Sequence, residues 1–390
     1  MRAALGHTLG RVVRDEMGRV LLSPGARLTP GLCEVLARRG YARVYVQDGI
    51  ADDVGPREAL TEQTRALAHG VAMECFRQVG RGDALPLQAV VSTVDAILRD
   101  LARARDVALE FATLRSASDY TYVHSVNVCV YSLLVAQPLA ISGQELRALG
   151  IGALLHDVGK VLCADLCSKP GALSAADWIR IRQHPIDGFE MLRQHHDLHL
   201  FAAHIAYQHH ERLDGSGYPR GLRDEKILPV ARIVAAADVY DAMTSDRPYA
   251  PARPTVEALA VLREGAGRLF DADVVRAFVQ RLAVYPSGTP VLLADSTVGV
   301  VVGQGSRPDA PRVRALGRAG TTFPGDAEIE ATGVQAVASV LQDWPPWLIA
   351  GPLRRTGSGP APSAADRDGA RCGAPGKPAV APRPPAPNGP

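Results

Sequence analysis

Short apolar runs separated by turn residues open the chain. Residues 11–13 and 20–22 are such runs, and the polar, glycine-containing stretch between them predicts a β-hairpin. Thr29 precedes a proline, which is the pattern of a helix N-cap with proline in the first turn. Residues 42–46 then return to a strand pattern. We therefore expect residues 1–50 to form a small β-rich module that receives an input.

A helical period replaces this pattern further along the chain. Apolar side chains recur every three or four residues over 57–79, and a second run with the same period covers 87–114. These two runs predict helices that belong to a connector, residues 51–117, between the first module and the rest of the chain.

The longest helical stretch covers residues 118–283. Two helix starts within it have the sequence of a capping box, in which Ser142 precedes Glu145 by three residues and Ser174 precedes Asp177. The pattern predicts a mainly α domain, and the candidate chemistry of the chain falls inside it.

Strand-like runs return after this domain. Residues 289–293 and 298–302 are apolar and are separated by an Asp-Ser pair, which predicts a small β appendage over 284–350. The stretch 351–390 contains ten of the chain's 29 prolines, together with many glycines, alanines and serines. Such a composition cannot bury a core, so we expect a disordered tail there.

Composition is that of a globular protein with a buried core, since 47% of the residues are hydrophobic and 22% are charged. A net charge of +2 argues against a protein dedicated to nucleic-acid polymers. The most apolar segment, residues 126–141, is too short to span a bilayer, and residues 1–13 lack the apolar core of a signal peptide. Six scattered cysteines without CxxC spacing favour buried thiols, so we expect a cytoplasmic protein.

Histidines and aspartates are concentrated in the helical domain. His156 and Asp157 follow an apolar helical run that needs a core, so both should lie close to the interior. Neighbouring buried imidazole and carboxylate groups are unfavourable unless they pair or bind a metal. These groups suit iron, manganese, zinc or nickel. The candidate metal ligands are His124, His156, Asp157, His184, His209, His210 and Asp238.

This set is large enough for two cations with positions left for water and substrate. A carboxylate can bridge two cations roughly 3.5–4 Å apart, and such a pair holds the attacking and leaving oxygens of a phosphoryl displacement. Lone histidines more often lie at the surface or in hydrogen bonds than on a metal. We apply that interpretation to His7, His69, His195, His196, His199 and His204.

Five sequence elements resemble the HD-GYP subgroup of the HD phosphohydrolase superfamily. Residues 156–160 read HDVGK and match its HD-x-GK element, and residues 209–219 read HHERLDGSGYP and match its HHE-x-x-DGxGYP element. The other three are residues 120–127, 169–185 and 238–249. The resemblance covers residues 118–282 and implies a mainly α fold, an HD-domain helical bundle with the β-rich module and the β appendage on either side.

The resemblance implies a phosphodiesterase that hydrolyses cyclic di-GMP to linear pGpG, GMP or both. A hydroxide activated by two divalent metals, iron or manganese, would attack the phosphorus, and Asp157 and Lys160 would be the catalytic residues. Tyr120 occupies the position where some relatives carry a glutamate that helps to bind a third metal, so we expect two metals. One would be held by His124, His156, Asp157 and Asp238, and the other by Asp157 as a bridge with His184, His209 and His210.

The resemblance also implies the contacts to cyclic di-GMP. The expected contact residues are Lys160, Gly217, Tyr218, Pro219, Asp241 and Arg247. Ala250 stands where relatives usually carry a lysine or another polar residue, which removes one expected contact. The GYP loop, residues 215–219, would also recruit diguanylate cyclase-type proteins. Formation of a homodimer is left open.

Two other functions remain in competition. A hydrolase of another cyclic dinucleotide would carry the same motifs. A sensor or scaffold that binds cyclic di-GMP without cleaving it would be recognised by the loss of metal ligands, and the sequence retains every one of them.

The composition of residues 351–390 generates a direct test. Deleting this stretch should leave catalysis and the melting temperature nearly unchanged, because a segment without a core packs against nothing. Thermal unfolding and turnover of the truncated chain check this expectation, and a large drop in melting temperature would contradict it.

Overall fold

The computed structural model describes residues 5–15, 19–39, 41, 44–47, 49, 52–54, 59–103, 120–167, 169, 173–245, 252–307, 309–318, 321–323, 327–333 and 336–341. Contacts group Met1–Arg354 into one unit and Arg355–Pro390 into another, and the second unit lies outside the described residues, as does the tail predicted from 351 onward. Among the described helices, none has the combination of length and apolar character that crossing a membrane requires.

The first module contains two small antiparallel sheets and one helix. Strand β2 (Val13–Arg14) pairs with β3 (Val20–Leu22), which confirms the predicted hairpin. Strand β1 (Thr8–Leu9) pairs with β4 (Val46–Gln47), a shorter strand than the sequence predicted. Helix α1 (Pro30–Arg38) begins as expected, because the Thr29 hydroxyl accepts a hydrogen bond from the amide of Leu32. The module has a small core of its own, made of Leu9, Val13, Leu28, Cys33, Leu36 and Tyr41.

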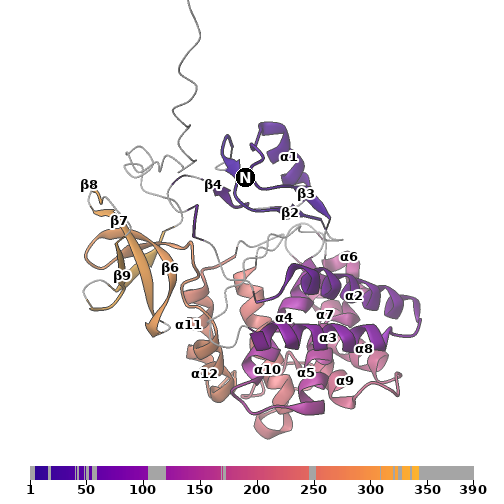
Figure 1. Ribbon diagram of the computed structural model, residues 1–390. Helices are drawn as coiled ribbons and strands as arrows, with labels where there is room; N and C mark the ends of the chain where they lie inside the picture. Colours follow the sequence, from indigo (N-terminus) through magenta and orange to yellow (C-terminus); the bar gives the residue numbers. More distant parts are fainter. Residues whose placement is uncertain are drawn as a thin grey trace, which may run out of the picture. The chain divides into compact units, whose positions relative to one another are not determined.

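A helical bundle follows and carries the candidate site (Figure 1). Its connector helix α2 begins at Glu62, five residues later than the start of the predicted run. The reason is that the Thr61 hydroxyl caps the Thr64 amide while Asp100 accepts from the Thr61 amide. The helices are α2 (Glu62–Arg81), α3 (Leu87–Arg103), α4 (Tyr120–Ala136), α5 (Gly143–Leu155), η3 (Val158–Cys163), α6 (Ala164–Cys167), α7 (Ala175–Ile181), α8 (His184–Leu192), α9 (Leu200–Gln208), η4 (Asp224–Lys226), α10 (Pro229–Thr244), α11 (Thr255–Gly265) and α12 (Ala272–Arg281).

Helices α4, α5 and α10 are the centre of this bundle. They are apolar on nearly every side, which is the property of a helix surrounded by others. Helix α4 packs on α5 and α10, and α5 also packs on α9. Leu133, Leu149 and Leu154 are completely buried there, and burial of each stabilises the fold by roughly 1.5–3 kcal/mol. The candidate ligands therefore project from a tightly packed frame.

The two predicted capping boxes had different outcomes. At α7 the prediction is confirmed: the Ser174 hydroxyl accepts from the Asp177 amide, and the Asp177 carboxylate accepts from the Ser174 amide. At α5 the prediction is wrong, because Ser142 occupies the N-cap position without any side-chain cap hydrogen bond. Gly143, the first residue of that helix, has φ 61°, so the first turn departs from regular helix and its amides do not face the Ser142 hydroxyl.

The predicted β appendage is an antiparallel sheet with the strand order β10-β5-β6-β7-β8, and β9 also pairs with β7. At the predicted turn between β5 and β6, Asp295 accepts a hydrogen bond from the Thr297 amide and Ser296 has φ 68°. The strands are β5 (Pro290–Leu293), β6 (Thr297–Arg307), β7 (Ala310–Arg318), β8 (Thr321–Thr322), β9 (Glu328–Glu330) and β10 (Val337–Val340).

A close backbone approach fixes η3 against α8. A Cβ atom at Gly159 would lie 2.1 Å from the carbonyl oxygen of His184 and 2.6 Å from the amide of Gly188. Only glycine fits this approach, and it brings the residues after α5 next to the first turn of α8.

Gly159→Ala should therefore destabilise the fold by at least about 2 kcal/mol, because the new methyl group meets rigid backbone. The control is Gly80→Ala in α2, where the added Cβ would make an ordinary contact with Val161 at 3.6 Å. That change should be neutral or stabilise by about 0.4–1 kcal/mol. Urea unfolding of both variants measures the difference, and equal effects would contradict the steric argument.

Candidate metal centre

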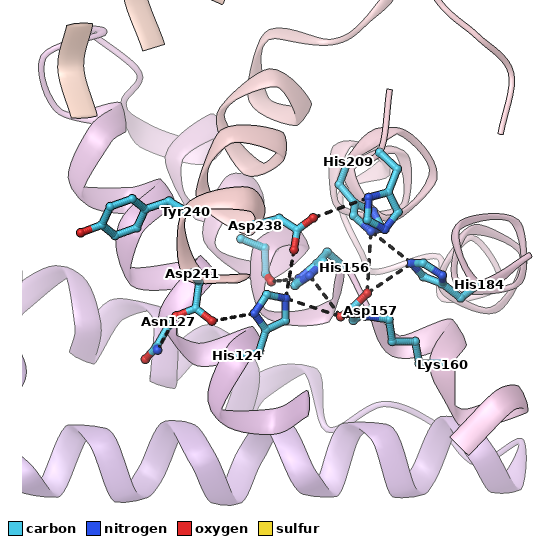
Figure 2. A network of polar contacts seen from close by, with 12 residues as sticks. His124, Asn127, His156, Asp157, Lys160, His184, His209, Asp238, Tyr240 and Asp241 are labelled. Atoms are coloured by element: carbon cyan, nitrogen blue, oxygen red, sulfur yellow. Dashed lines mark hydrogen bonds and ion pairs between the residues drawn. The ribbon is translucent and has the colours of Figure 1, made fainter. Parts of the chain in front are cut away.

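Helix ends and two helix interiors bring the candidate ligands to one point. His124 lies on α4, Asp238 lies on α10, and His184 is the first residue of α8. The His156-Asp157 pair directly follows α5, and the His209-His210 pair directly follows α9. Figure 2 shows the side chains of His124, His156, His184, His209 and Asp238 gathered around Asp157. Six of the seven are buried, and His210 is the partly exposed member.

The two oxygens of Asp157 face two different sets of histidines. Oδ2 lies 3.4 Å from His156 Nε2 and 3.7 Å from His124 Nε2. Oδ1 lies 3.3 Å from His184 Nε2 and 3.7 Å from His209 Nε2. Asp157 thus has the orientation of a carboxylate that connects two cation positions.

Asp238 also lies between both sets. Its Oδ1 is 3.1 Å from His124 Nε2, and its Oδ2 is 3.5 Å from His210 Nδ1. The sequence led us to expect Asp238 beside one metal only. In the structure, Asp238 Oδ1 lies beside His124 of the first set, and Asp238 Oδ2 lies near His210 of the second set.

Main-chain carbonyls orient three of the imidazole rings. The Nδ1 atoms of His156, His184 and His209 lie 2.7, 2.6 and 2.9 Å from the carbonyl oxygens of the residues three positions earlier. A ring that donates its Nδ1 proton to a carbonyl has an unprotonated Nε2. These three rings therefore turn their lone pairs toward Asp157.

The donor set fits divalent cations. Among the described residues, the buried atoms His156 Nε2 and Asp157 Oδ1 have no hydrogen-bond partner. Such atoms are costly unless something else satisfies them. Nitrogen–oxygen separations of 3.1–3.7 Å are those of two ligands that share one ion at about 2.0–2.2 Å from each. Two sets meet this condition, His124 with His156 and Asp157, and Asp157 with His184, His209 and His210.

The charges of the cluster agree with this interpretation. Burial alone would raise the pKa of Asp157, but Lys160 and His156 hold it well below its usual range. Burial and neighbouring imidazoles lower the pKa of His209 and His210 well below its usual value. Asp157 is therefore ionised and His209 and His210 are neutral, which are the forms that bind metals.

Lys160 lies at the edge of the cluster with its ammonium 2.5 Å from Asp157 Oδ2. Burial opposes the charge, but Asp157 and Asp238 raise the pKa of Lys160 above its usual value. The side chain is therefore an ammonium at neutral pH, so it acts as a hydrogen-bond donor and not as a base.

The structure contradicts the expected substrate contact of Asp241. This residue is completely buried behind His124, and its Oδ2 lies 2.7 Å from His124 Nδ1. Its Oδ1 accepts a hydrogen bond from Asn127 Nδ2 at 2.7 Å. Asp241 thus orients a ligand from behind and has no access to a substrate. Burial lowers the pKa of His124, but Asp238 and Asp241 more than offset this and raise it to about 9.

Sequence reasoning assigned no role to Asn127. It lies one helical turn after His124, as Asp241 lies one turn after Asp238, so the two helices present matching pairs of residues. The repeated three-residue spacing is the signal that could have identified this pair.

The chain after the histidine pair folds back toward the cluster. The buried carboxylate of Glu211 accepts hydrogen bonds from the amides of Arg220 and Leu222 at 2.9 and 2.8 Å, which closes the segment containing the GYP loop. A Cβ at Gly217 would lie 2.5 Å from the His210 carbonyl oxygen, so the loop approaches the ligands as only glycine allows. The ring of Tyr218 stacks on His210 at 4.6 Å.

The remaining expectations concern residues around this cluster. Pro219 is half-buried in the GYP loop. Arg247, Ala250 and the side chain of Tyr120 lie outside the described residues. Neither candidate ligand group in the described part of the chain includes any of the other six histidines. Cys33, Cys75, Cys129 and Cys163 are buried free thiols, as expected, and Cys167 is partly exposed.

Comparison with known proteins identifies an HD domain and relatives that are cyclic dinucleotide phosphodiesterases. The HD domain family model matches residues 103–274. The chain is 36% identical over 285 residues to cyclic di-GMP phosphodiesterase PA4108 of Pseudomonas aeruginosa, covering 73% of this chain and 67% of that protein. It is 33% identical over 256 residues to 3'3'-cGAMP-specific phosphodiesterase 3 of Vibrio cholerae, covering 65% of this chain and 53% of that protein. The chain thus spans two thirds of the first relative and about half of the second.

Among solved structures, the chain is similar to Bd1817, an HD-GYP-type protein from Bdellovibrio bacteriovorus. The TM-score is 0.45 and the sequence identity is 19%, with 70% of this chain and 93% of that chain covered.

The position of Asp241 generates a test of the metal centre. Asp241→Asn should weaken metal binding about 10- to 100-fold, because the residue that orients His124 loses its charge and one acceptor. The control is Asp187→Asn, a half-buried aspartate three residues after His184 that makes no hydrogen bond to that ring. Competition with a metal chelator measures the affinity of each variant. Equal affinities in the wild type and in Asp241→Asn would refute the orienting role.

Proposed function

The chain belongs to the HD-domain family of cyclic di-GMP phosphodiesterases, and on that premise we propose that its metal centre hydrolyses a cyclic dinucleotide, with cyclic di-GMP as the substrate. The observation that supports this most strongly is the orientation of Asp157, whose two oxygens face two separate sets of buried histidines. A phosphodiester has both an attacking and a leaving oxygen to stabilise, and a pair of cations suits that requirement.

The residues divide into two ligand sets around the shared carboxylate. The first cation would be held by His124, His156, Asp157 and Asp238, and the second by Asp157, His184, His209 and His210. When bound, such ions supply a nucleophilic water at neutral pH and offset the charge that develops on the phosphoryl oxygens. Nitrogen and carboxylate donors of this kind suit iron or manganese.

Lys160 would act on the substrate side of this centre. One of its three donors is directed to Asp157, and its side chain is about one fifth exposed, so the other donors can reach a phosphate oxygen. Its raised pKa keeps the proton on the nitrogen. The residue therefore binds and neutralises the phosphate or donates to the departing ribose oxygen.

The loop that carries Tyr218 would form the wall of the substrate site. Glu211 holds this segment closed, and Gly217 allows it to approach the histidine pair. Tyr218 and Pro219 would then contact the bound dinucleotide beside the second ligand set. Recruitment of a diguanylate cyclase-type protein would use the same loop.

A second candidate substrate is 3'3'-cGAMP, because a relative specific for it matches 65% of this chain. A binding protein without catalysis is disfavoured, because every candidate ligand is present and directed to one point. The two substrates are distinguished by incubating metal-loaded protein with cyclic di-GMP, 3'3'-cGAMP and cyclic di-AMP. We expect the fastest conversion for cyclic di-GMP, followed as pGpG and GMP by chromatography.

Asp157→Ala should abolish hydrolysis and reduce the bound metal, because the carboxylate shared by both sets is lost while the helices around it keep their apolar contacts. The control is Asp165→Ala, an exposed aspartate eight residues later that pairs with Arg180. Turnover and elemental analysis are measured on both variants. Wild-type turnover in Asp157→Ala would overturn the two-cation assignment.

A further inference from the structure

Three side chains stack outward from the second ligand set. The ring of Tyr218 lies 4.6 Å from the ring of His210, with an angle of 26° between the planes. The guanidinium of Arg182 lies over Tyr218, with its Cζ 5.2 Å from the ring centroid. A positive charge is thus held beside a candidate metal ligand, with one aromatic ring between them.

Local structure explains why Arg182 lies there. It is the C-cap residue of α7 and precedes His184 by two positions, so its main chain is fixed by the helix end and by the ligand that follows. Its amide donates to the carbonyls of Arg180 and Trp178. The side chain is exposed, and stacking on Tyr218 is the contact that orients it.

The charge of Arg182 is not neutralised within the described part of the chain. Neighbouring arginines pair with acids, Arg180 with Asp165 and Arg193 with Glu190. Arg182 has no carboxylate within ion-pair distance among the described residues. A guanidinium that lies over a ring keeps N–H groups for other partners, and a phosphate can bind these groups through two parallel hydrogen bonds.

A cyclic dinucleotide has two phosphates on opposite sides of one ring. Only one of them can lie at the cations during cleavage, so the other is directed away from the ligand sets. We propose that Arg182 binds this second, uncleaved phosphate and so selects cyclic dinucleotides over simple phosphodiesters. The inference rests on the proposed function and adds a specificity residue that the sequence did not single out.

The test compares a substrate that has the second phosphate with one that lacks it. Metal-loaded wild type, Arg182→Ala and Arg182→Lys are assayed with cyclic di-GMP and with bis(p-nitrophenyl) phosphate. For Arg182→Ala we expect KM for cyclic di-GMP to rise about tenfold, with kcat within about twofold, because a hydrogen-bonded charge contact is lost from binding. Any increase in KM for the small diester should be at least about fivefold smaller than the increase for cyclic di-GMP. Arg182→Lys should be intermediate, because it keeps the charge without the planar fork.

Arg193→Ala is the matched control. Arg193 is also exposed and lies over an aromatic ring, 5.9 Å from the centroid of Phe189, but it pairs with Glu190 and does not stack on Tyr218. It should retain wild-type KM values for both substrates. Cyclic di-AMP is added as a competitor to separate a phosphate contact from a guanine contact. A similar increase in its inhibition constant in Arg182→Ala supports the phosphate.

The other outcomes each reject a specific statement. An equal increase in KM for both substrates would show that Arg182 only supports the metal centre. An increase in KM or inhibition constant confined to guanine-bearing ligands would show a contact to the base. Either result overturns the proposal. Unchanged KM in Arg182→Ala, with wild type active on cyclic di-GMP, would reject the inference alone. If the wild type hydrolyses the small diester but neither binds nor cleaves any cyclic dinucleotide, the proposed function is rejected as well.

Discussion

Burial of the Asp157 carboxylate among imidazole rings is the constraint on which the rest of the site depends. A carboxylate that is 1% exposed is strongly unfavourable unless positive charge surrounds it. Lys160 supplies one such charge and remains at the edge. Burial lowers the pKa of His209 and His210, so these two rings are neutral and supply no positive charge, and divalent cations are the natural complement. The helix ends that meet here are arranged around this requirement.

A further layer of contacts makes the centre rigid. Main-chain carbonyls direct three imidazole rings, and Asp241 with Asn127 directs a fourth. The three carbonyls lie three positions before their rings, whereas Asp241 reaches His124 from α10, so the orientation of the candidate ligands depends on helix geometry and on the packing of α4 against α10. The completely buried leucines of α4 and α5 keep those helices in register, so packing far from the candidate metal centre also determines the positions of its candidate ligands.

The sequence allowed the helical bundle, the hairpin and the β appendage to be predicted, because each has a local pattern, whereas the grouping of the candidate ligands into two sets came from the resemblance to the HD-GYP subgroup. Prediction failed where a residue's role depends on the direction of its side chain or on contacts between segments that are distant in sequence. Spacing alone cannot tell whether Asp241 faces a substrate or the back of His124. The missing side-chain cap at Ser142 depends on the backbone angle of Gly143. Arg182 meets Tyr218 across 36 positions of sequence, and no periodicity reports such a contact.

Glu211 connects the candidate metal ligands to the proposed wall of the substrate site within one short piece of chain. It directly follows His210, and its buried carboxylate is satisfied only while the amides of Arg220 and Leu222 face it. Opening that wall would break both hydrogen bonds and leave a buried carboxyl group without its donors, so the closed arrangement is favoured before any ligand arrives. Ordering a loop residue costs about 1–2 kcal/mol of backbone entropy. That loss is taken during folding of the chain, so a ligand that enters meets a preorganised surface and keeps more of its contact energy as affinity.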